Sequence, residues 1–475
     1  MPNRELSVAL SHEVNAVLMK HLIRFDGQED LIFALWTPSQ GTNRLTGLIH
    51  TPLPPIEGDR QCHGNASFNP QYFERISKVA FKEKCGIAFL HSHPGPGWQG
   101  MSKDDIVAET KYASAVAALT DLPLLGLTVG SDGTWSARMW EHVRDRSYQR
   151  KWCHSVRCVG QRLAVNFNDT LIERPEFLET FKRTVTVWGE VNHINMARLR
   201  IGIIGLGSVG SIIAEALARM GMTRFVLIDF DEVQKHNLDR LLGATLDDLG
   251  KLKIVVAERE IRKSATAARV DILPVPASVA EEVGYHAALD CDVIFSCVDR
   301  PRPRSILNHI AYSHLIPVID GGIEVRFNKN LEFTGVDWQL QTVAPGRPCL
   351  DCLGVFNPAD VSTEVEGKLD DPTYLRGLPE SHRFKRNENV FPFSANLASL
   401  EILQFVALST SIAGISDFGV QRYRYNPGIL ECDKEKFCRP DCGYAVLTGQ
   451  GDRFFTLFGF DIAAETARTR QRKKL

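Results

Sequence analysis

The feature that most constrains the fold is a glycine-rich turn set between an apolar stretch and a helix-like stretch. From residue 200 the chain reads RIGIIGLGSVGSIIAEALARMGMTRFVLIDFD, and Gly205, Gly207 and Gly210 form a G-x-G-x-x-G motif. A strand before such a turn and a helix after it predict a βαβ unit and a parallel sheet. Asp229 closes the next apolar stretch, where a carboxylate can bind a ribose. Strand-like segments at 292–299 and 317–320 continue the pattern. We therefore predict a Rossmann-like α/β domain with a mostly parallel sheet over residues 199–475.

The polar residues after the glycine motif separate two interpretations. An NAD-dependent dehydrogenase would share the motif and Asp229. Residues 229–233 read DFDEV, residues 237–240 read NLDR, and Lys253 follows. This series closely resembles the E1-like ThiF/MoeB family, whose pattern is DxDxV, then NLxR, then a lysine. The resemblance implies ATP-dependent adenylation of a peptide carboxylate, with Mg²⁺, and disfavours the dehydrogenase.

The same resemblance assigns a role to each matching position. Arginine, lysine and Mg²⁺ suit a reaction that gathers negative charge on a transferring phosphate. By this resemblance, Gly205, Gly207 and Gly210 form the glycine loop, and Asp229 binds the ribose. Asn237, Arg240 and Lys253 bind the phosphates, and Asp299 binds magnesium. Arg183 reaches across a homodimer to the partner's ATP.

A second constellation lies near the N-terminus, in HSHPGPGWQGMSKDD. His91 and His93 stand at i and i+2 after an apolar, strand-like run, so both side chains project to one side. Both can bind one zinc ion, and Asp105, with Asp104 as the rival, can supply a third ligand from the next helix. Three protein ligands leave a fourth position open, as a catalytic zinc site requires.

The series HxHP followed by SxxD resembles the JAMM (MPN+) zinc isopeptidases. The resemblance covers roughly residues 1–140 and implies a JAB/MPN α/β domain with zinc held by His91, His93 and Asp105. It also implies that Ser102 stabilises the oxyanion and that an early glutamate acts as the base. Glu29 is our choice for that glutamate, with Asp30 as the alternative. Residues 141–198 read as a connector into the next domain.

The chain has eleven cysteines, an odd count, which include CLDC at 349–352 and CRPDC at 438–442. This pattern favours reduced thiols and a metal over disulfides. By resemblance to activating enzymes, Cys349, Cys352, Cys438 and Cys442 form a structural zinc site, and Cys432 is a possible replacement. Relatives place a catalytic thiol in the segment after the first pair. No cysteine lies between Leu353 and Leu430. A thioester on this chain is therefore disfavoured, and direct transfer of the acyl adenylate is expected.

The bulk properties exclude some classes of function. A formal net charge of −2 gives no global signal for nucleic acid or a membrane surface. No apolar run approaches the roughly 18 residues of a spanning helix, and the N-terminus has no apolar signal region. We expect a cytoplasmic protein, with its basic end, RTRQRKKL, as a solvated tail.

Together the two resemblances imply one shared substrate. This would be a ubiquitin-like protein ending in glycine, which the first domain trims or removes from a target and the second adenylates. An E2-like protein often accompanies such fusions. One alternative is a sulfur-carrier adenylyltransferase with a processing activity, used in cofactor biosynthesis. Another is a regulator without catalysis, which the intact His91, His93, Asp105, Arg240 and Lys253 disfavour.

Overall fold

The computed structural model describes residues 4–144, 147–176, 179–328, 330, 332–377, 389–454 and 459–472. The chain forms two compact units. The first consists of Met1–Glu173, Ser313–Leu315 and Leu447–Phe455, and the second of the remaining residues. The stretch 141–198 is therefore not a separate connector: its first part belongs to the first unit, and its last part, from Arg174, to the second.

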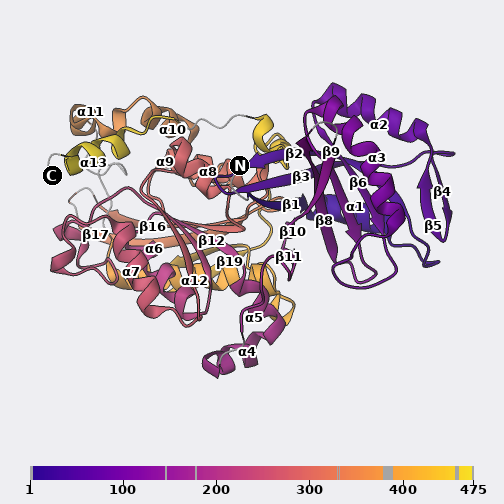
Figure 1. The fold of residues 1–475 in the computed structure, drawn as a ribbon. Helices are drawn as coiled ribbons and strands as arrows, with labels where there is room; N and C mark the ends of the chain where they lie inside the picture. Colours follow the sequence, from indigo (N-terminus) through magenta and orange to yellow (C-terminus); the bar gives the residue numbers. More distant parts are fainter. Residues whose placement is uncertain are drawn as a thin grey trace. The chain divides into compact units, whose positions relative to one another are not determined.

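The first unit is built on a nine-stranded mixed sheet (Figure 1). In sheet order the strands are β11 (Leu163–Phe167), β10 (Ser155–Val159), β1 (Glu5–Ser11), β3 (Arg44–Leu53), β2 (Leu31–Gln40), β6 (Gly86–Ser92), β7 (Leu124–Val129), β8 (Trp135–Arg144) and β9 (Ser147–Trp152). β11 enters this sheet because β10 pairs in parallel with β1 on one side and antiparallel with β11 on the other.

Helices cover both faces of this sheet. α1 (His12–Leu22) packs Leu18 and Leu22 into the core of one face. It begins at the N-cap Ser11, whose Oγ accepts a hydrogen bond from the backbone N–H of Val14 at 3.2 Å. α2 (Pro70–Glu83) and α3 (Lys103–Thr120) contribute to the core of the other face. A small hairpin, β4 (Arg60–His63) and β5 (Asn65–Phe68), forms its own two-stranded sheet.

Two short segments from late in the chain complete the first unit beside β2. Thr37 Oγ1 donates to the carbonyl of Gly449 at 2.8 Å, and the backbone N–H of Gln40 donates to Asp452 at 3.0 Å. His314 Nδ1 lies 2.8 Å from the hydroxyl of Ser39. Residues far apart in sequence therefore share one core, which the sequence patterns do not indicate.

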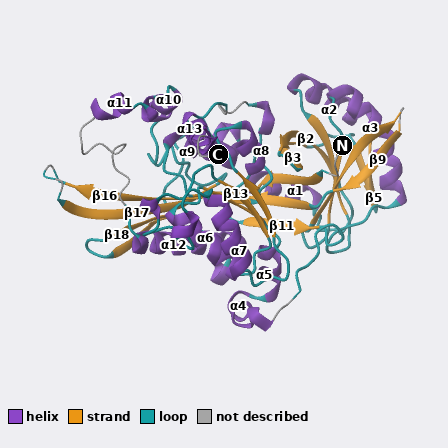
Figure 2. Cartoon of the chain, turned by 60° about the vertical axis from the view of Figure 1, so that its left-hand side comes forward, coloured by secondary structure: helices purple, strands orange, loops and turns teal. Residues whose placement is uncertain are grey.

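The second unit is built on an eight-stranded sheet (Figure 2). In sheet order the strands are β14 (Asp271–Val275), β13 (Arg224–Ile228), β12 (Arg200–Ile204), β15 (Val293–Ser296), β16 (Val318–Phe327), β17 (Phe333–Val343), β18 (Val420–Arg424) and β19 (Ile429–Asp433). The strands from β14 to β16 pair in parallel, and those from β16 to β19 pair antiparallel. The sheet is mixed rather than mostly parallel, because the chain reverses directly after β16.

Helices lie on both faces of this sheet as well. α8 (Glu282–Ala288) and α9 (Pro301–Ser313) pack into the larger core. α6 (Ser208–Arg219) lies between α7 (Lys253–Ser264) and α12 (Phe391–Thr410) on the opposite face (Figure 1). The remaining helices are α4 (Lys182–Trp188), α5 (Glu190–Ala197), α10 (Pro358–Val365), α11 (Pro372–Gly377) and α13 (Ile462–Arg472).

Among the described helices, α12 is long and apolar enough to cross a membrane by length and composition. The sequence analysis expects no such segment. Half of the most apolar part of α12 is buried, and the helix packs on β16 and β17 and against α6. It also buries the polar side chains of Glu401 and Gln404. These contacts are those of a core helix beside a sheet.

Candidate functional site

Two histidines lie at the end of a central strand of the first unit. His91 is in β6, and His93 follows that strand by one residue, so both side chains project to the same side. β6 pairs with β2 on one side and with β7 on the other, and His91 is only 4% exposed. The sheet therefore gives the first histidine a rigid and largely dry position.

Asp105 approaches these histidines from the first turn of α3. Ser102 is the N-cap of this helix, and its Oγ accepts a hydrogen bond from the N–H of Asp105 at 3.1 Å. The N–H of Ser102 in turn donates to Asp105 Oδ2 at 2.7 Å. This capping box fixes the carboxylate, whose oxygens lie 3.3 Å from Nε2 of His91 and 3.3 Å from Nε2 of His93. Asp104, the rival ligand, is exposed.

The spacing of the three side chains suits a tetrahedral zinc ion. The Nε2 atoms of His91 and His93 lie 3.2 Å apart, and one ligand atom from each of the three residues lies within 4.8 Å of the others. With metal–ligand bonds of about 2.0–2.2 Å, two ligands of a tetrahedral site are about 3.3 Å apart. The donor set of two imidazoles and one carboxylate therefore fits a zinc site with a fourth position left for substrate or water.

The surroundings of the cluster favour a neutral His91 and an ionised Asp105. Burial lowers the pKa of His91. Burial opposes ionisation of Asp105, but its hydrogen bonds with His91 and His93 hold its pKa below the ordinary value. The bond with Asp105 raises the pKa of His93. A carboxylate held ionised beside a neutral imidazole is the state that binds a metal.

Glu29 lies next to this cluster. Leu31 pairs with His91 in the antiparallel ladder between β2 and β6, and the N–H of Ser92 donates to the carbonyl of Asp30 at 3.0 Å. Continuing that register places Glu29 opposite His93. Burial raises the pKa of Glu29, and the charges of His93 and Asp105 also act on it. A carboxylate with a raised pKa beside a metal cluster is suited to accept a proton.

Asp30 has a structural environment instead. Its side chain is 1% exposed, and it forms ion pairs with Arg60 at 3.0 Å and Arg24 at 3.4 Å. It also accepts a hydrogen bond from the N–H of Leu31 at 2.8 Å. The structure therefore favours Glu29 over Asp30 as the proton acceptor.

Three buried polar residues behind His91 are absent from the sequence analysis. Thr128 in β7 lies with its hydroxyl 3.3 Å from Nε2 of His91, and Arg138 in β8 donates to that hydroxyl at 2.5 Å. Glu109 in α3 forms an ion pair with Arg138. Two signals single out these residues without showing that they pair: Glu109 stands four residues after Asp105 on one helix face, and Arg138 interrupts the apolar strand WSARMW.

In the second unit, the glycine motif lies at the carboxyl end of β12. Gly205 has φ +90°, and a Cβ there would meet the carbonyl of Cys297 at 2.5 Å. A Cβ on Gly207 would meet no atom within 4 Å, so the turn is open on that side. α6 begins at Ser208 without a side-chain cap. Its first N–H groups and its positive end are therefore suited to a phosphate group.

A set of partly buried charges follows β13. Asp229 accepts hydrogen bonds from the N–H groups of Leu206 at 2.6 Å and Asp231 at 2.7 Å. Lys253 Nζ donates to Asp231 Oδ2 at 2.7 Å. Burial raises the pKa of Asp229, and the charge of Lys253 opposes this. Burial disfavours the ammonium of Lys253, but Asp229, Asp231 and Asp299 raise its pKa, so it stays charged.

The other predicted nucleotide residues lie around this set or on the surface. Asn237 Oδ1 accepts from the N–H of Gln234 at 3.0 Å. Arg240 donates to the carbonyl of His236 at 2.6 Å and to Asp239 at 2.9 Å, which leaves other guanidinium N–H groups for a ligand. Asp299 is exposed just after β15, and Arg183 is exposed on α4. The contact of Arg183 across a dimer stays a prediction.

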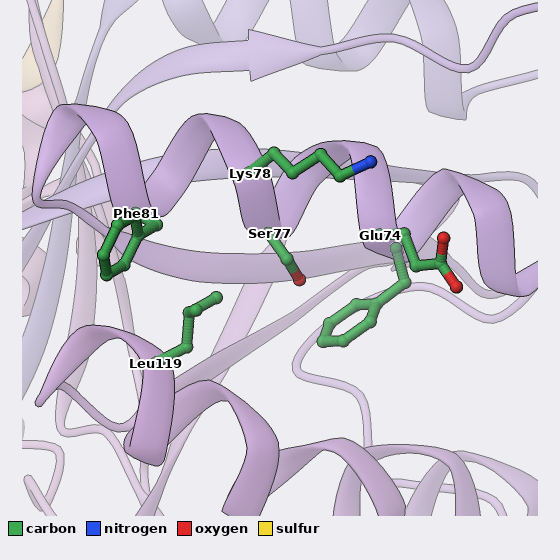
Figure 3. A pocket seen from close by; sticks show the side chains of 6 residues that line it. Glu74, Ser77, Lys78, Phe81 and Leu119 are labelled. Carbon is green, nitrogen blue, oxygen red and sulfur yellow. The ribbon is translucent and has the colours of Figure 1, made fainter.

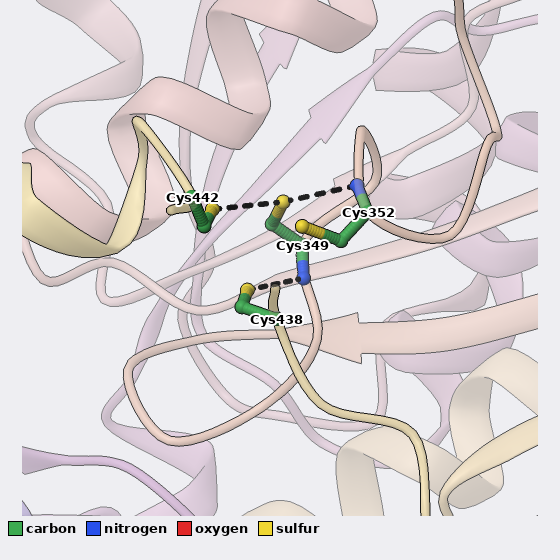
Figure 4. Close-up of side chains that lie close together, drawn as sticks. All are labelled: Cys349, Cys352, Cys438 and Cys442. Atoms are coloured by element: carbon green, nitrogen blue, oxygen red, sulfur yellow. Dashed lines mark hydrogen bonds between the residues drawn. The ribbon is translucent and has the colours of Figure 1, made fainter. Parts of the chain in front are cut away.

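Four cysteines of the second unit come together, as the resemblance to activating enzymes implies (Figure 4). Sγ atoms of Cys349 and Cys442 lie 3.7 Å apart, and all four Sγ atoms lie within 4.8 Å of one another. The backbone N–H of Cys349 donates to Cys438 Sγ at 3.2 Å, and that of Cys352 to Cys349 Sγ at 3.3 Å. Four thiolates with N–H donors and no open position fit a structural zinc ion.

Two further cysteines have other surroundings. Cys432, the possible replacement ligand, is exposed on β19 and lies outside this cluster. Cys297 follows β15, and burial raises the pKa of its thiol well above the usual value. Cys297 is only partly exposed, and a thiol that stays protonated is a weak nucleophile.

The first unit also has an apolar hollow of about 450 Å³ between α2 and α3 (Figure 3). Phe73, Glu74, Ser77, Lys78, Phe81 and Leu119 line it. Phe81 is 66% exposed at its rim. The residues of the histidine cluster do not line this hollow.

Comparison with known proteins decides the class of the second unit. Residues 181–413 match the model of the ThiF family. This region is a ThiF-type domain. It contains the glycine motif, Asp229, Lys253 and both cysteines of the first pair, while the second cysteine pair lies beyond the match. The first unit lies almost wholly outside the ThiF match.

Curated relatives resemble parts of the chain. One is the tRNA threonylcarbamoyladenosine dehydratase of Escherichia coli, 32% identical over 30% of this chain and 53% of that protein. Another is the SAMP-activating enzyme E1 of Haloferax volcanii, 28% identical over 37% of this chain and 62% of that protein. A third is the sulfur carrier protein ThiS adenylyltransferase of Bacillus subtilis, 32% identical over 38% of this chain and 54% of that protein. The chain spans about half the length of these relatives.

Solved structures resemble part of the chain more distantly. Escherichia coli MccB with ATP is 16% identical, over 56% of this chain and 74% of that chain, with a TM-score of 0.44. MccB with a MccA variant is 17% identical, over 57% of this chain and 75% of that chain, with the same TM-score of 0.44.

Proposed function

We propose that this chain is a bifunctional enzyme for a ubiquitin-like protein: its ThiF domain adenylates the protein's C-terminal carboxylate, and its first unit is a JAMM-type zinc isopeptidase. The observation that carries the first activity is the ThiF match around a glycine loop that faces Asp229 and Lys253. The observation that carries the second is the convergence of His91, His93 and Asp105 beside Glu29.

In the adenylation site the chain's own groups would neutralise and orient a nucleotide. The open side of Gly207 and the first N–H groups of α6 would receive phosphate oxygens. Lys253, whose pKa is raised by the charges of Asp229, Asp231 and Asp299, supplies a positive charge. Arg240 adds a second cation, and Asp229 and Asp299 supply acceptors for a ribose and for Mg²⁺.

In the isopeptidase site His91, His93 and Asp105 would hold zinc, which supplies a Lewis acid that polarises the scissile carbonyl. Glu29 would take the proton of the attacking water and deliver it to the leaving amine. Ser102 accepts a hydrogen bond from Asp105 through its Oγ, which leaves its hydroxyl proton free to donate to the developing oxyanion.

The proposed shared substrate is a ubiquitin-like protein ending in glycine. Relatives named for activating ubiquitin-like modifiers or a sulfur carrier support this substrate class. The chain lacks a cysteine between Leu353 and Leu430. Direct transfer of the acyl group to a partner thiol, as on an E2-like protein, therefore agrees better with the sequence than a thioester on this chain.

The second candidate is a sulfur-carrier adenylyltransferase with a processing activity. The similarity to the ThiS adenylyltransferase and the missing thiol both favour it. The two candidates differ in the fate of the adenylate. A ubiquitin-like modifier would move to a thiol or an amine, whereas a sulfur carrier would gain a thiocarboxylate.

The two activities can be separated by substitution. His93→Ala should remove one bound zinc ion and abolish cleavage of a carrier with a C-terminal extension, while pyrophosphate exchange with ATP continues. Asp105→Asn should behave in the same way, and Asp104→Asn, the matched exposed neighbour, should leave both activities unchanged. Asp299→Ala should reduce only pyrophosphate exchange. If His93→Ala keeps its full zinc content, the three side chains do not form the proposed zinc site.

A further inference from the structure

A buried ion pair lies between the sheet and the helix that carries Asp105. Arg138 in β8 donates through Nη2 and Nε to Glu109 in α3, the second bond at 3.1 Å. Arg138 is 0% exposed, and Glu109 is 1% exposed. Trp140 Nε1 donates to the same carboxylate at 2.6 Å. Both carboxylate oxygens and three guanidinium nitrogens therefore have partners inside an otherwise apolar core.

The strand register makes room for this pair. Arg138 stands directly opposite Gly126 in the antiparallel ladder of β7 and β8. A Cβ on Gly126 would lie 2.5 Å from the Glu109 carboxylate and 2.6 Å from Arg138 Nε. The missing side chain at this one position lets the carboxylate and the guanidinium meet over the strand.

Each residue of the ion pair is connected to a predicted metal ligand. Glu109 stands one helical turn after Asp105, on the same face of α3. Arg138 Nη1 donates to the hydroxyl of Thr128 at 2.5 Å, and that hydroxyl lies 3.3 Å from His91 Nε2. Thr128 is also the residue paired with His91 between β6 and β7. The pair thus joins the helix that bears the carboxylate to the strands that bear the imidazole.

We propose that Arg138 and Glu109 are positioning residues that set the distance between Asp105 and His91, a role that rests on the proposed zinc site. A buried ion pair is seldom retained for stability alone, because apolar residues of similar volume often stabilise a core as well or better. A fixed geometry between elements is a reason to keep it. Groups of this kind around metal ligands typically change metal affinity about 10- to 100-fold.

The test replaces the whole buried set with apolar side chains in the full-length protein. The variant Glu109→Leu with Arg138→Met and Trp140→Phe leaves no orphaned partner among the three. Its thermal midpoint and its pyrophosphate exchange should match those of the wild type. Its affinity for zinc at the histidine site, measured by competition with a chromophoric chelator, should fall about 10- to 100-fold. Unchanged affinity in this folded variant would overturn the positioning role.

A second measurement does not depend on zinc. Amide hydrogen exchange in the first turn of α3, at Asp105 and Ile106, should be faster in the metal-free triple variant than in the metal-free wild type. Leu18→Ala, in the core of the opposite face, is the matched control: it should lower stability but leave this turn and the zinc affinity unchanged. Equal exchange in the triple variant contradicts the proposal.

The two measurements also separate this role from the proposed function. If wild type and His93→Ala bind equal amounts of zinc, the isopeptidase proposal fails. Faster exchange in the α3 turn of the triple variant would then still show that the pair fixes Asp105. Loss of zinc affinity together with faster exchange supports both conclusions.

Discussion

Glu29 and Asp30 are neighbours in the chain, but their carboxylates have different surroundings. Asp30 is enclosed by Arg24, Arg60 and the N–H of Leu31, all of which favour its ionised form and hold it in place. Glu29 is only partly buried, and burial raises its pKa. Asp30 is therefore held charged and in place, whereas burial favours the protonated form of Glu29.

This contrast predicts opposite phenotypes. Glu29→Gln should lower the rate of precursor cleavage by about 10²- to 10⁴-fold, the typical effect of losing a general base, with the zinc content unchanged. Asp30→Asn should instead lower the free energy of unfolding of the first unit by about 1–3 kcal/mol, because it removes the charge of a buried carboxylate that pairs with the partly exposed Arg24 and Arg60. Cleavage kinetics and chemical denaturation measure the two effects. A stable Asp30→Asn protein without cleavage would reverse the assignment.

At the scale of elements, α10 shows how the segment after the first cysteine pair is used. After the first cysteine pair, positions 362–364 in α10 are Ser362, Thr363 and Glu364. Glu364 is buried, and its carboxylate accepts a hydrogen bond from the N–H of Arg302 at 2.8 Å, in the first turn of α9. The segment therefore anchors one helix against the start of another.

This anchor predicts a pH dependence of stability. Burial raises the pKa of Glu364 from 4.5 to about 7. Because the folded pKa is above the unfolded value, the favourable contribution is complete below pH 4.5 and is lost as the pH rises through 7. The loss should be on the order of 3 kcal/mol. Glu364→Gln keeps an acceptor for Arg302, so its unfolding free energy should lack this decrease. Parallel pH curves for both proteins would contradict the prediction.

At the scale of the whole molecule, features that depend on contiguous sequence motifs could be predicted, whereas contacts between residues far apart in the sequence could not. The glycine loop, the histidine pair and the cysteine pairs could be read because each lies within a few residues of sequence. The Arg138–Glu109 pair and the mixed sheet could not, because both depend on which strands become neighbours. The same holds for residues 447–454, which join β2 through Thr37 and Gln40.

The late segment gives a prediction at this scale. Gly451 has φ +50°, and a Cβ there would collide with the carbonyl of Pro38. Gly451→Ala should therefore lower the free energy of unfolding of the first unit by about 1–3 kcal/mol, although the substitution lies far along the chain. Gly443→Ala, where a Cβ would meet nothing within 4 Å, is the control and should be neutral. Thermal unfolding followed through the first unit's tryptophans checks both.

The interleaving of the two units has a consequence for how the protein is made. The first 173 residues leave the ribosome long before Gly449 and Asp452 have been synthesised. β2 therefore cannot form its contacts with these two residues until translation is nearly complete. The early product lacks those contacts during that time. A gene split between residues 173 and 174 would separate the cluster of His91, His93 and Asp105 from part of its own scaffold. Evolution can therefore exchange the two units between proteins less freely than their order along the chain suggests.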